Sequence, residues 1–208
     1  MIVVKYRYTV VMPDVYKPLE TVRQDWTTTK LPSICHAQTM LLVCPIYYSY
    51  EQQRKKYVQV LLDVEGKFGT ERAFNLSRQL QRKFKFLTME FTGKTGFHLA
   101  SKFLVELEED DVRVIRKKIL GPMNVLDNPL IDATSSIRAM PTIRIGRMGN
   151  RLAFPVRKKW TYKEFEKRRR TVKELCDIFS EENMKNYILT YIVPDKIVSY
   201  DYFLKLVE

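Results

Sequence analysis

The apolar positions in the first part of the chain come in short runs separated by polar breaks, a pattern typical of strands. Residues 2–11 are rich in β-branched and aromatic side chains and predict a strand that closes just before Pro13. Residues 39–44 predict a second strand, which we expect to stop at Pro45 because proline cannot donate a ladder hydrogen bond. Residues 57–62 predict a third strand, apolar enough to be largely buried.

After Gly66 the apolar positions change to helical spacing. Ala73, Leu76, Leu80 and Phe84 fall on one face of a predicted helix. A second helix is predicted with acids at its start, bases at its end and Gly121-Pro122 as its stop. The remaining expected elements are strands at 85–91, 97–100 and 130–132, a strand pair within 143–154, the second helix at 108–120, and a helical region from Trp160 onward.

The alternation of strands and helices over residues 57–120 predicts an α+β or α/β fold. The chain has 208 residues, of which 45% are apolar and 12% aromatic, so a single domain with a buried core is expected and disorder over most of the chain is excluded. We divide it into an N-terminal part at about 1–56, a sheet-based core at 57–155 and a basic helical segment at 156–208.

Charge adds a class of partner to this picture. The 36 Lys and Arg residues outnumber the 24 Asp and Glu residues, and a net charge of +12 predicts attraction to a polyanion. The excess is concentrated between Arg151 and Lys173, where Trp160 and Tyr162 could stack on bases. The alternative is a solvated helix whose Phe165 faces the core. The residues expected to contact nucleic acid are Arg157, Lys158, Lys159, Trp160, Arg168, Arg169 and Arg170.

The cysteines and the hydropathy pattern point to the cytoplasm. Cys35, Cys44 and Cys176 are odd in number and widely spaced, which argues against a disulfide framework. His36 beside Cys35 does not complete a ligand pattern, so no structural zinc is expected. No apolar run approaches the roughly 18 residues of a membrane span, and neither a signal peptide nor a membrane partner is expected.

Two carboxylates follow the third predicted strand. Asp63 and Glu65 are two residues apart, so on an extended backbone their side chains project from the same face. Such a pair repels itself unless it is solvated or bridged by a cation, and Mg²⁺ prefers carboxylate oxygens. The pair is therefore a candidate metal site, with a solvent-facing strand end as the alternative.

Two further features follow in the chain. Residues 92–96 form a turn with two glycines, where backbone N–H groups, Lys94 and His98 could bind a phosphate, although an ordinary β-turn has the same composition. Asp132 comes at a predicted strand end and is followed by a series of arginines. A lone acid there is often only a turn residue. Three acids and basic groups in this order nevertheless match the needs of a metal-dependent nucleotidyl transferase.

The order of these motifs resembles the archaeo-eukaryotic primase (primase–polymerase) superfamily. Residues 62–65 (LDVE) match its hydrophobic-Asp-hydrophobic-acid motif, and residues 92–98 (TGKTGFH) match its Ser-Gly-x-x-Gly-x-His turn with Thr92 in place of Ser. Asp132, the segment from Arg138 to Pro141 and residues 146–149 (GRMG) resemble its third motif. The likeness covers about 57–155, and the Glu at position 65 is closest to plasmid- or virus-type bifunctional primase–polymerases.

The resemblance implies a fold, an activity and partners. The fold would be an RRM-like antiparallel sheet carrying the acids, packed with a second α/β lobe. The enzyme would be a DNA primase or polymerase that transfers a nucleotide from an NTP or dNTP to a 3′-hydroxyl on single-stranded or primer-template DNA, beside a helicase or other replication proteins. Asp63, Glu65 and Asp132 would be catalytic and hold two Mg²⁺ or Mn²⁺ ions, and Thr92, Lys94, His98, Arg138 and Arg147 would bind the nucleotide.

Two other classes of function fit parts of the sequence. A non-catalytic nucleic-acid-binding subunit of a replication complex could keep the fold, but such a relative should have lost an acid or His98, and none is missing. An RRM-like RNA-binding module would place aromatics on adjacent strands, as Phe84, Phe86 and Phe91 could do, but it leaves Asp63 and Glu65 unexplained.

Overall fold

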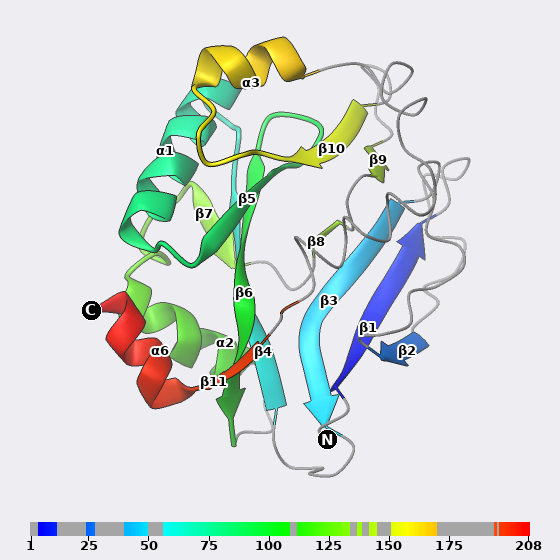
Figure 1. Ribbon diagram of the computed structural model, residues 1–208, viewed down its shortest axis with the longest axis vertical. Coiled ribbons are helices and arrows are strands. Elements are labelled where there is room, and N and C mark those ends of the chain that lie inside the picture. The colour runs from blue at the N-terminus through cyan, green and yellow to red at the C-terminus, as the bar shows by residue number, and fades with distance from the viewer. Residues whose placement is uncertain are drawn as a thin grey trace.

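The fold combines helices with a mainly antiparallel sheet, which confirms the α+β class expected from the sequence. A computed structural model describes residues 4–11, 24–27, 40–49, 56–108, 112–133, 137–138, 142–144, 151–169, 194 and 196–208. In Figure 1 the helices lie to one side of the central strands and the N-terminal strands lie to the other.

The strands form one extended sheet. Its order is β2-β1-β3-β4-β6-β5-β10-β9, with β7 paired to β4, β8 paired to β3 and β11 paired to β6. The last of these pairs is parallel. The strands are β1 (Val4–Val11), β2 (Gln24–Thr27), β3 (Met40–Ser49), β4 (Lys56–Val64), β5 (Leu87–Phe91), β6 (Phe97–Leu107), β7 (Ile131–Ala133), β8 (Ile137–Arg138), β9 (Thr142–Arg144), β10 (Arg151–Pro155) and β11 (Lys196–Ser199).

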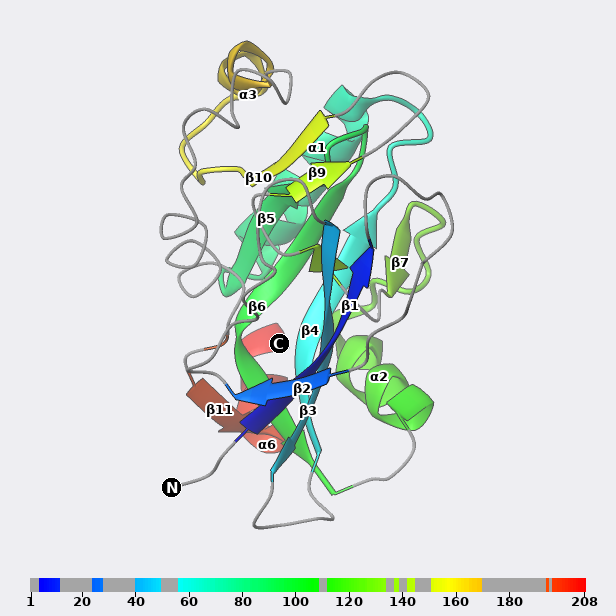
Figure 2. The same ribbon diagram turned by 90° about the vertical axis from the view of Figure 1, so that its right-hand side faces the viewer.

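The helices cover one face of the sheet. They are α1 (Thr70–Lys83), α2 (Val112–Leu120), α3 (Tyr162–Arg168) and α6 (Tyr200–Val207), with the short 3₁₀ helix η1 (Gly121–Met123) after α2. The turned view in Figure 2 shows α3 at one end of the molecule and β11 with α6 at the other. Each α-helix of the described residues contributes side chains to a single apolar cluster with the sheet.

Alternation along β4 and β6 divides the sheet into two faces. Leu62 and Val64 on β4, and Phe97 and Leu99 on β6, belong to the apolar cluster together with Phe74 of α1. Since successive side chains of a strand point to opposite faces, the residues between them project away from the helices. The same rule holds on β5, where Leu87, Met89 and Phe91 face the cluster. Asp63 and His98 therefore lie on the face of the sheet that points away from the helices, called here the helix-free face.

The prediction that the second strand stops at Pro45 is wrong. β3 continues through Pro45 to Ser49. Against β1 the register shifts at this point, because Arg7 is opposite Cys44 whereas Tyr6 is opposite Tyr47. Pro45 therefore lies in a bulge, where its missing N–H breaks no ladder hydrogen bond.

Other predicted elements are confirmed with changed bounds. The strands expected at 2–11, 57–62 and 85–91 correspond to β1, β4 and β5, and the helix around Ala73 is α1. The strand expected at 97–100 continues to Leu107, and the strand pair expected within 143–154 is β9 with β10. The expected helix at 108–120 is described from Val112, and residues 109–111 lie outside the described ranges.

The expectation of a helical region from Trp160 onward holds only in part. α3 and α6 are helices, but Lys196–Ser199 form β11, which pairs with β6. Residues 170–193 and 195 of this region lie outside the described residues. Within the described part of the chain, no helix has the length and apolarity required to cross a bilayer.

Candidate functional site

Three of the predicted site residues lie side by side across the sheet. Asp63 of β4 is opposite His98 of β6 on one side and opposite Asp132 of β7 on the other. Directly opposed residues on neighbouring antiparallel strands point to the same face, with Cβ atoms roughly 4.5–5.5 Å apart. The backbone pairing therefore brings Asp132, Asp63 and His98 into one row on the helix-free face.

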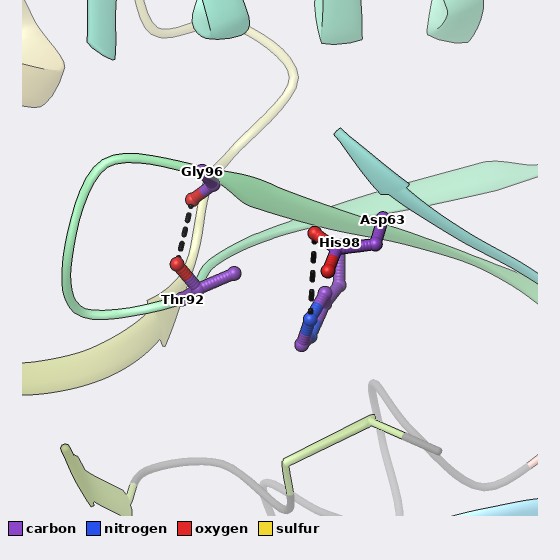
Figure 3. Close-up of polar contacts among 4 residues, drawn as sticks. All are labelled: Asp63, Thr92, Gly96 and His98. Carbon is purple, nitrogen blue, oxygen red and sulfur yellow. Dashed lines mark hydrogen bonds and ion pairs between the residues drawn. The ribbon is translucent and has the colours of Figure 1, made fainter. Parts of the chain in front are cut away.

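The closest contact in this row joins Asp63 and His98. The Nε2 atom of His98 lies 3.8 Å from Oδ1 of Asp63, so the two form an ion pair when the imidazole is protonated. The His98 side chain is buried, whereas the Asp63 side chain is 32% exposed. Figure 3 shows the two side chains together on one side of the strands. Part of the Asp63 side chain is therefore accessible to a ligand, and the buried imidazole of His98 lies beside it.

Glu65 lies two residues beyond Asp63, just after the end of β4. It follows the last residue of β4, and its backbone N–H donates to the carbonyl of Leu130 at 2.8 Å, so the pairing with the β7 segment extends to this position. Glu65 is half-buried and Asp132 is exposed. The three predicted acids, Asp63, Glu65 and Asp132, are therefore all at least partly accessible to solvent, at the end of the row formed by β4 and β7.

The row also contains an acid that the sequence analysis did not identify. Glu90 of β5 is directly opposite His98, so its side chain joins the same face. It is 1% exposed, and among the described residues neither carboxylate oxygen has a hydrogen-bond partner. Burial raises the pKa of Glu90 to about 8, which favours the neutral acid at pH 7. The signal in the sequence was a lone acid among the apolar residues of a buried strand.

The predicted phosphate-binding turn is a tight hairpin between β5 and β6. The N–H and Oγ1 of Thr92 both donate to the carbonyl of Gly96, at 3.1 and 3.0 Å (Figure 3). Gly93 has φ 83°, a conformation that favours glycine. A Cβ on Gly96 would lie 2.6 Å from the carbonyl oxygen of Val64, so the hairpin is seated against the end of β4. Lys94 is exposed at its tip.

Several predicted site residues can be placed only partly. Arg138 lies on β8, opposite Leu42 of β3, and its side chain is outside the described set. Arg147 and Arg170 lie outside the described residues altogether. The structure therefore leaves the expected contribution of these three arginines as a prediction.

The basic segment after β10 is fixed to α1. The guanidinium of Arg78, on α1, donates to the carbonyls of Arg157 at 2.5 Å and Trp160 at 3.1 Å, and to Oε1 of Gln81 at 2.6 Å. Lys158 Nζ donates to the carbonyl of Lys85 at 2.9 Å. The turn from Arg157 to Trp160 is thus held from two sides and presents a defined surface beside α1.

Arg78 is itself a buried cation. Its pKa is lowered, chiefly by burial and secondarily by the nearby charge of Arg82. The guanidinium also lies over the ring of Phe74, 4.9 Å from its centroid. The contacts of its Nη atoms to carbonyl oxygens offset part of the cost of removal from water, while its buried Nε has no hydrogen-bond partner among the described residues.

The predicted nucleic-acid-binding residues of α3 divide into two groups. The guanidinium carbon of Arg168 lies 4.8 Å from the centre of the Trp160 ring, and both residues reach the surface. Arg169 instead pairs with Glu166 at 3.1 Å and donates to Thr70 of α1 at 3.4 Å, which gives it a role in packing. Phe165 of α3 is fully buried, as the alternative interpretation of this helix expected.

No group of three His, Cys, Asp or Glu side chains suited to holding a metal ion occurs in the part of the chain that the structure describes. The backbone nevertheless makes Asp63 and Asp132 direct neighbours. Their carboxylate oxygens are the donors that Mg²⁺ and Mn²⁺ prefer, so the donor chemistry fits such an ion.

Comparisons with known proteins add no assignment, since no family model, no curated protein and no solved structure matches the chain.

Proposed function

We propose that the protein is a metal-dependent nucleotidyltransferase of the primase–polymerase type. It would transfer a nucleotide from an NTP or dNTP to a 3′-hydroxyl on a single-stranded or primed DNA template, with replication proteins such as a helicase as partners. The observation that carries the proposal is the row of Asp132, Asp63 and His98 on three adjacent strands. These residues are separated by more than thirty positions in the sequence and become neighbours through the strand pairing.

The architecture supports the proposal at a coarse level. An antiparallel sheet with helices on one face carries the row of Asp132, Asp63 and His98 on the other face, as an RRM-like catalytic core would. The strands β1, β2 and β3 extend this sheet on the β4 side and would form the second lobe (Figure 1). The Asp63 side chain is 32% exposed on this face.

In this proposal each group of residues has a separate task. Asp63, Glu65 and Asp132 would hold two Mg²⁺ or Mn²⁺ ions, and when bound these supply Lewis-acid stabilisation of the attacking and leaving oxygens. Lys94 would contact the triphosphate from the hairpin tip, and Thr92 would keep the hairpin closed through Gly96. His98 would fix the orientation of the Asp63 carboxylate beside the nucleotide. Arg138 and Arg147 would add positive charge near the nucleotide.

A primer-extension assay tests the activity. The full chain is incubated with a single-stranded template, with and without primer, and with NTPs or dNTPs plus Mg²⁺ or Mn²⁺. We expect Asp63→Asn and Asp132→Asn each to reduce incorporation by at least 100-fold, on the order of the effect of removing one electrostatic catalytic group. Asp201→Asn is the matched control, because Asp201 is an exposed acid on α6.

The outcomes separate catalysis from binding. Incorporation that persists in the Asp63→Asn and Asp132→Asn variants would refute the proposed site. Template binding without incorporation under any of these conditions would favour the non-catalytic accessory subunit, which is also consistent with the lack of a gathered three-ligand group among the described side chains.

A further inference from the structure

The exposed side of α1 separates two neighbouring pockets on the helix-covered side of the sheet. One pocket, of about 640 Å³, lies between α1 and the turn leading to α3, and the other, of about 820 Å³, lies between α1 and the segment before β7. Asn75 and Gln79 of α1 line both. Each volume is within the range of ligand pockets, so either can take a nucleotide-sized group.

The pocket beside α3 is suited to phosphate. Among the described residues, the charged side chains that line it are all cations, namely Arg78, Arg82, Lys158 and Lys159. The Trp160 ring lies in the same wall, with the guanidinium carbon of Arg168 at 4.8 Å from its centre. Arg78 fixes the turn that carries these lysines and the tryptophan, so the donors are held in place before a ligand arrives.

The pocket on the other side of α1 is suited to bases. Phe68 is 65% exposed, and the guanidinium carbon of Arg72 lies 5.0 Å from the centre of its ring. The lining also includes the amide side chains of Asn124 and Asn128, which can both donate and accept hydrogen bonds, and a single acid, Asp127. An exposed aromatic ring with amides around it provides a stacking platform that any base can use.

We infer that the exposed side of α1 is a binding site for single-stranded nucleic acid. The site also includes Phe68 in the pocket on one side of α1 and Trp160 in the pocket on the other. A strand crossing Asn75 and Gln79 would stack one base on each aromatic residue and place its phosphates against the cations of the α3 side. Duplex DNA does not fit this arrangement, because its bases are already stacked on one another. The inference does not rest on the proposed function, because binding here does not require the acidic row.

Fluorescence anisotropy with labelled dT20 and rU20 measures binding, with circular dichroism as the check of folding. We expect Trp160→Ala and Phe68→Ala each to weaken binding by roughly 5- to 150-fold, the effect of losing one stacked base. Arg82→Gln should instead lower the slope of log affinity against log salt by about 0.7, the contribution of one single-strand phosphate. The matched controls on α6 are Tyr202→Ala, which removes an exposed ring, and Lys205→Gln, which removes an exposed charge.

The results distinguish this site from the proposed catalysis. Unchanged affinity in both Phe68→Ala and Trp160→Ala would overturn the inference even if the protein incorporates nucleotides. Equal losses in the α6 controls, or no binding of either oligonucleotide at low salt, would overturn it as well. Loss of binding in the α1-side variants with normal binding by Asp63→Asn would support it, whether or not the chain proves to be a transferase. A preference for dT20 or rU20 would identify the strand as DNA or RNA.

Discussion

Replacing Glu90 with Gln should make the protein more stable, and increasingly so as pH rises. Glu90 is 1% exposed, and its pKa is raised by burial from the ordinary 4.5 to about 8. Between these values the folded protein keeps a proton that the unfolded chain has lost. Since the folded state then binds more protons, the free energy of unfolding falls as pH rises through this window.

The size of the effect follows from the shift. Each pH unit inside the window costs about 1.4 kcal/mol, so the wild-type protein should lose about 3 kcal/mol between pH 5 and pH 7.5 through this one residue. Glu90→Gln has no such proton to lose. The stability of the variant relative to wild type should therefore rise by about the same amount over that range.

Urea unfolding followed by tryptophan fluorescence, at pH 5, 6, 7 and 7.5, provides the measurement. Wild type is compared with Glu90→Gln and with Glu108→Gln, whose carboxyl is exposed. A difference between Glu90→Gln and wild type that is constant with pH would refute the reasoning, because it would mean that the buried carboxyl titrates alike in both states. An equal pH effect in Glu108→Gln would refute it too.

Three further substitutions test the packing around the site by urea unfolding. Gly96→Ala should cost about 1–3 kcal/mol, because its Cβ would lie 2.6 Å from the backbone oxygen of Val64; stability equal to wild type would show that the hairpin is not seated on β4. Arg78→Ala should cost about 1–3 kcal/mol by leaving partly buried carbonyls of the turn from Arg157 to Trp160 without their donor, and an unaffected midpoint would contradict the proposed fixing of that turn. Phe165→Ala should cost about 3–5 kcal/mol, since the ring is fully buried and stacks on Phe74 at 5.4 Å; Phe165→Leu should recover much of the loss, and equal losses in the two variants would contradict a packing role.

Local pattern predicted most of the elements of this fold. The helical spacing of Ala73, Leu76 and Leu80 identified α1, and the apolar run at 57–62 identified β4, because both signals lie within one element. Pro45 shows the limit of such signals. Proline excludes a ladder hydrogen bond but not a strand, and the bulge that accommodates it depends on the register against β1.

The candidate site was predicted as a set of motifs but not as a geometry. The sequence placed Asp63, His98 and Asp132 at strand ends, whereas their pairing depends on which strands become neighbours, and that is decided by contacts far apart in the chain. Glu90 was missed for the same reason. Its alternation with Met89 and Phe91 showed that it faces away from the core cluster, but only the register opposite His98 relates it to the site.

The parallel pairing of β11 with β6 has a consequence for how the chain is made. β5 covers β6 only as far as Ser101, and the stretch from Phe103 to Glu106 is completed by Lys196–Ser199, roughly ninety residues later. During synthesis on the ribosome, the edge of β6 that β11 will occupy has unpaired backbone hydrogen-bonding groups until β11 is made. An unpaired strand edge can associate with other nascent chains. Association of this stretch with other chains should therefore remain possible until β11 has emerged and paired with β6.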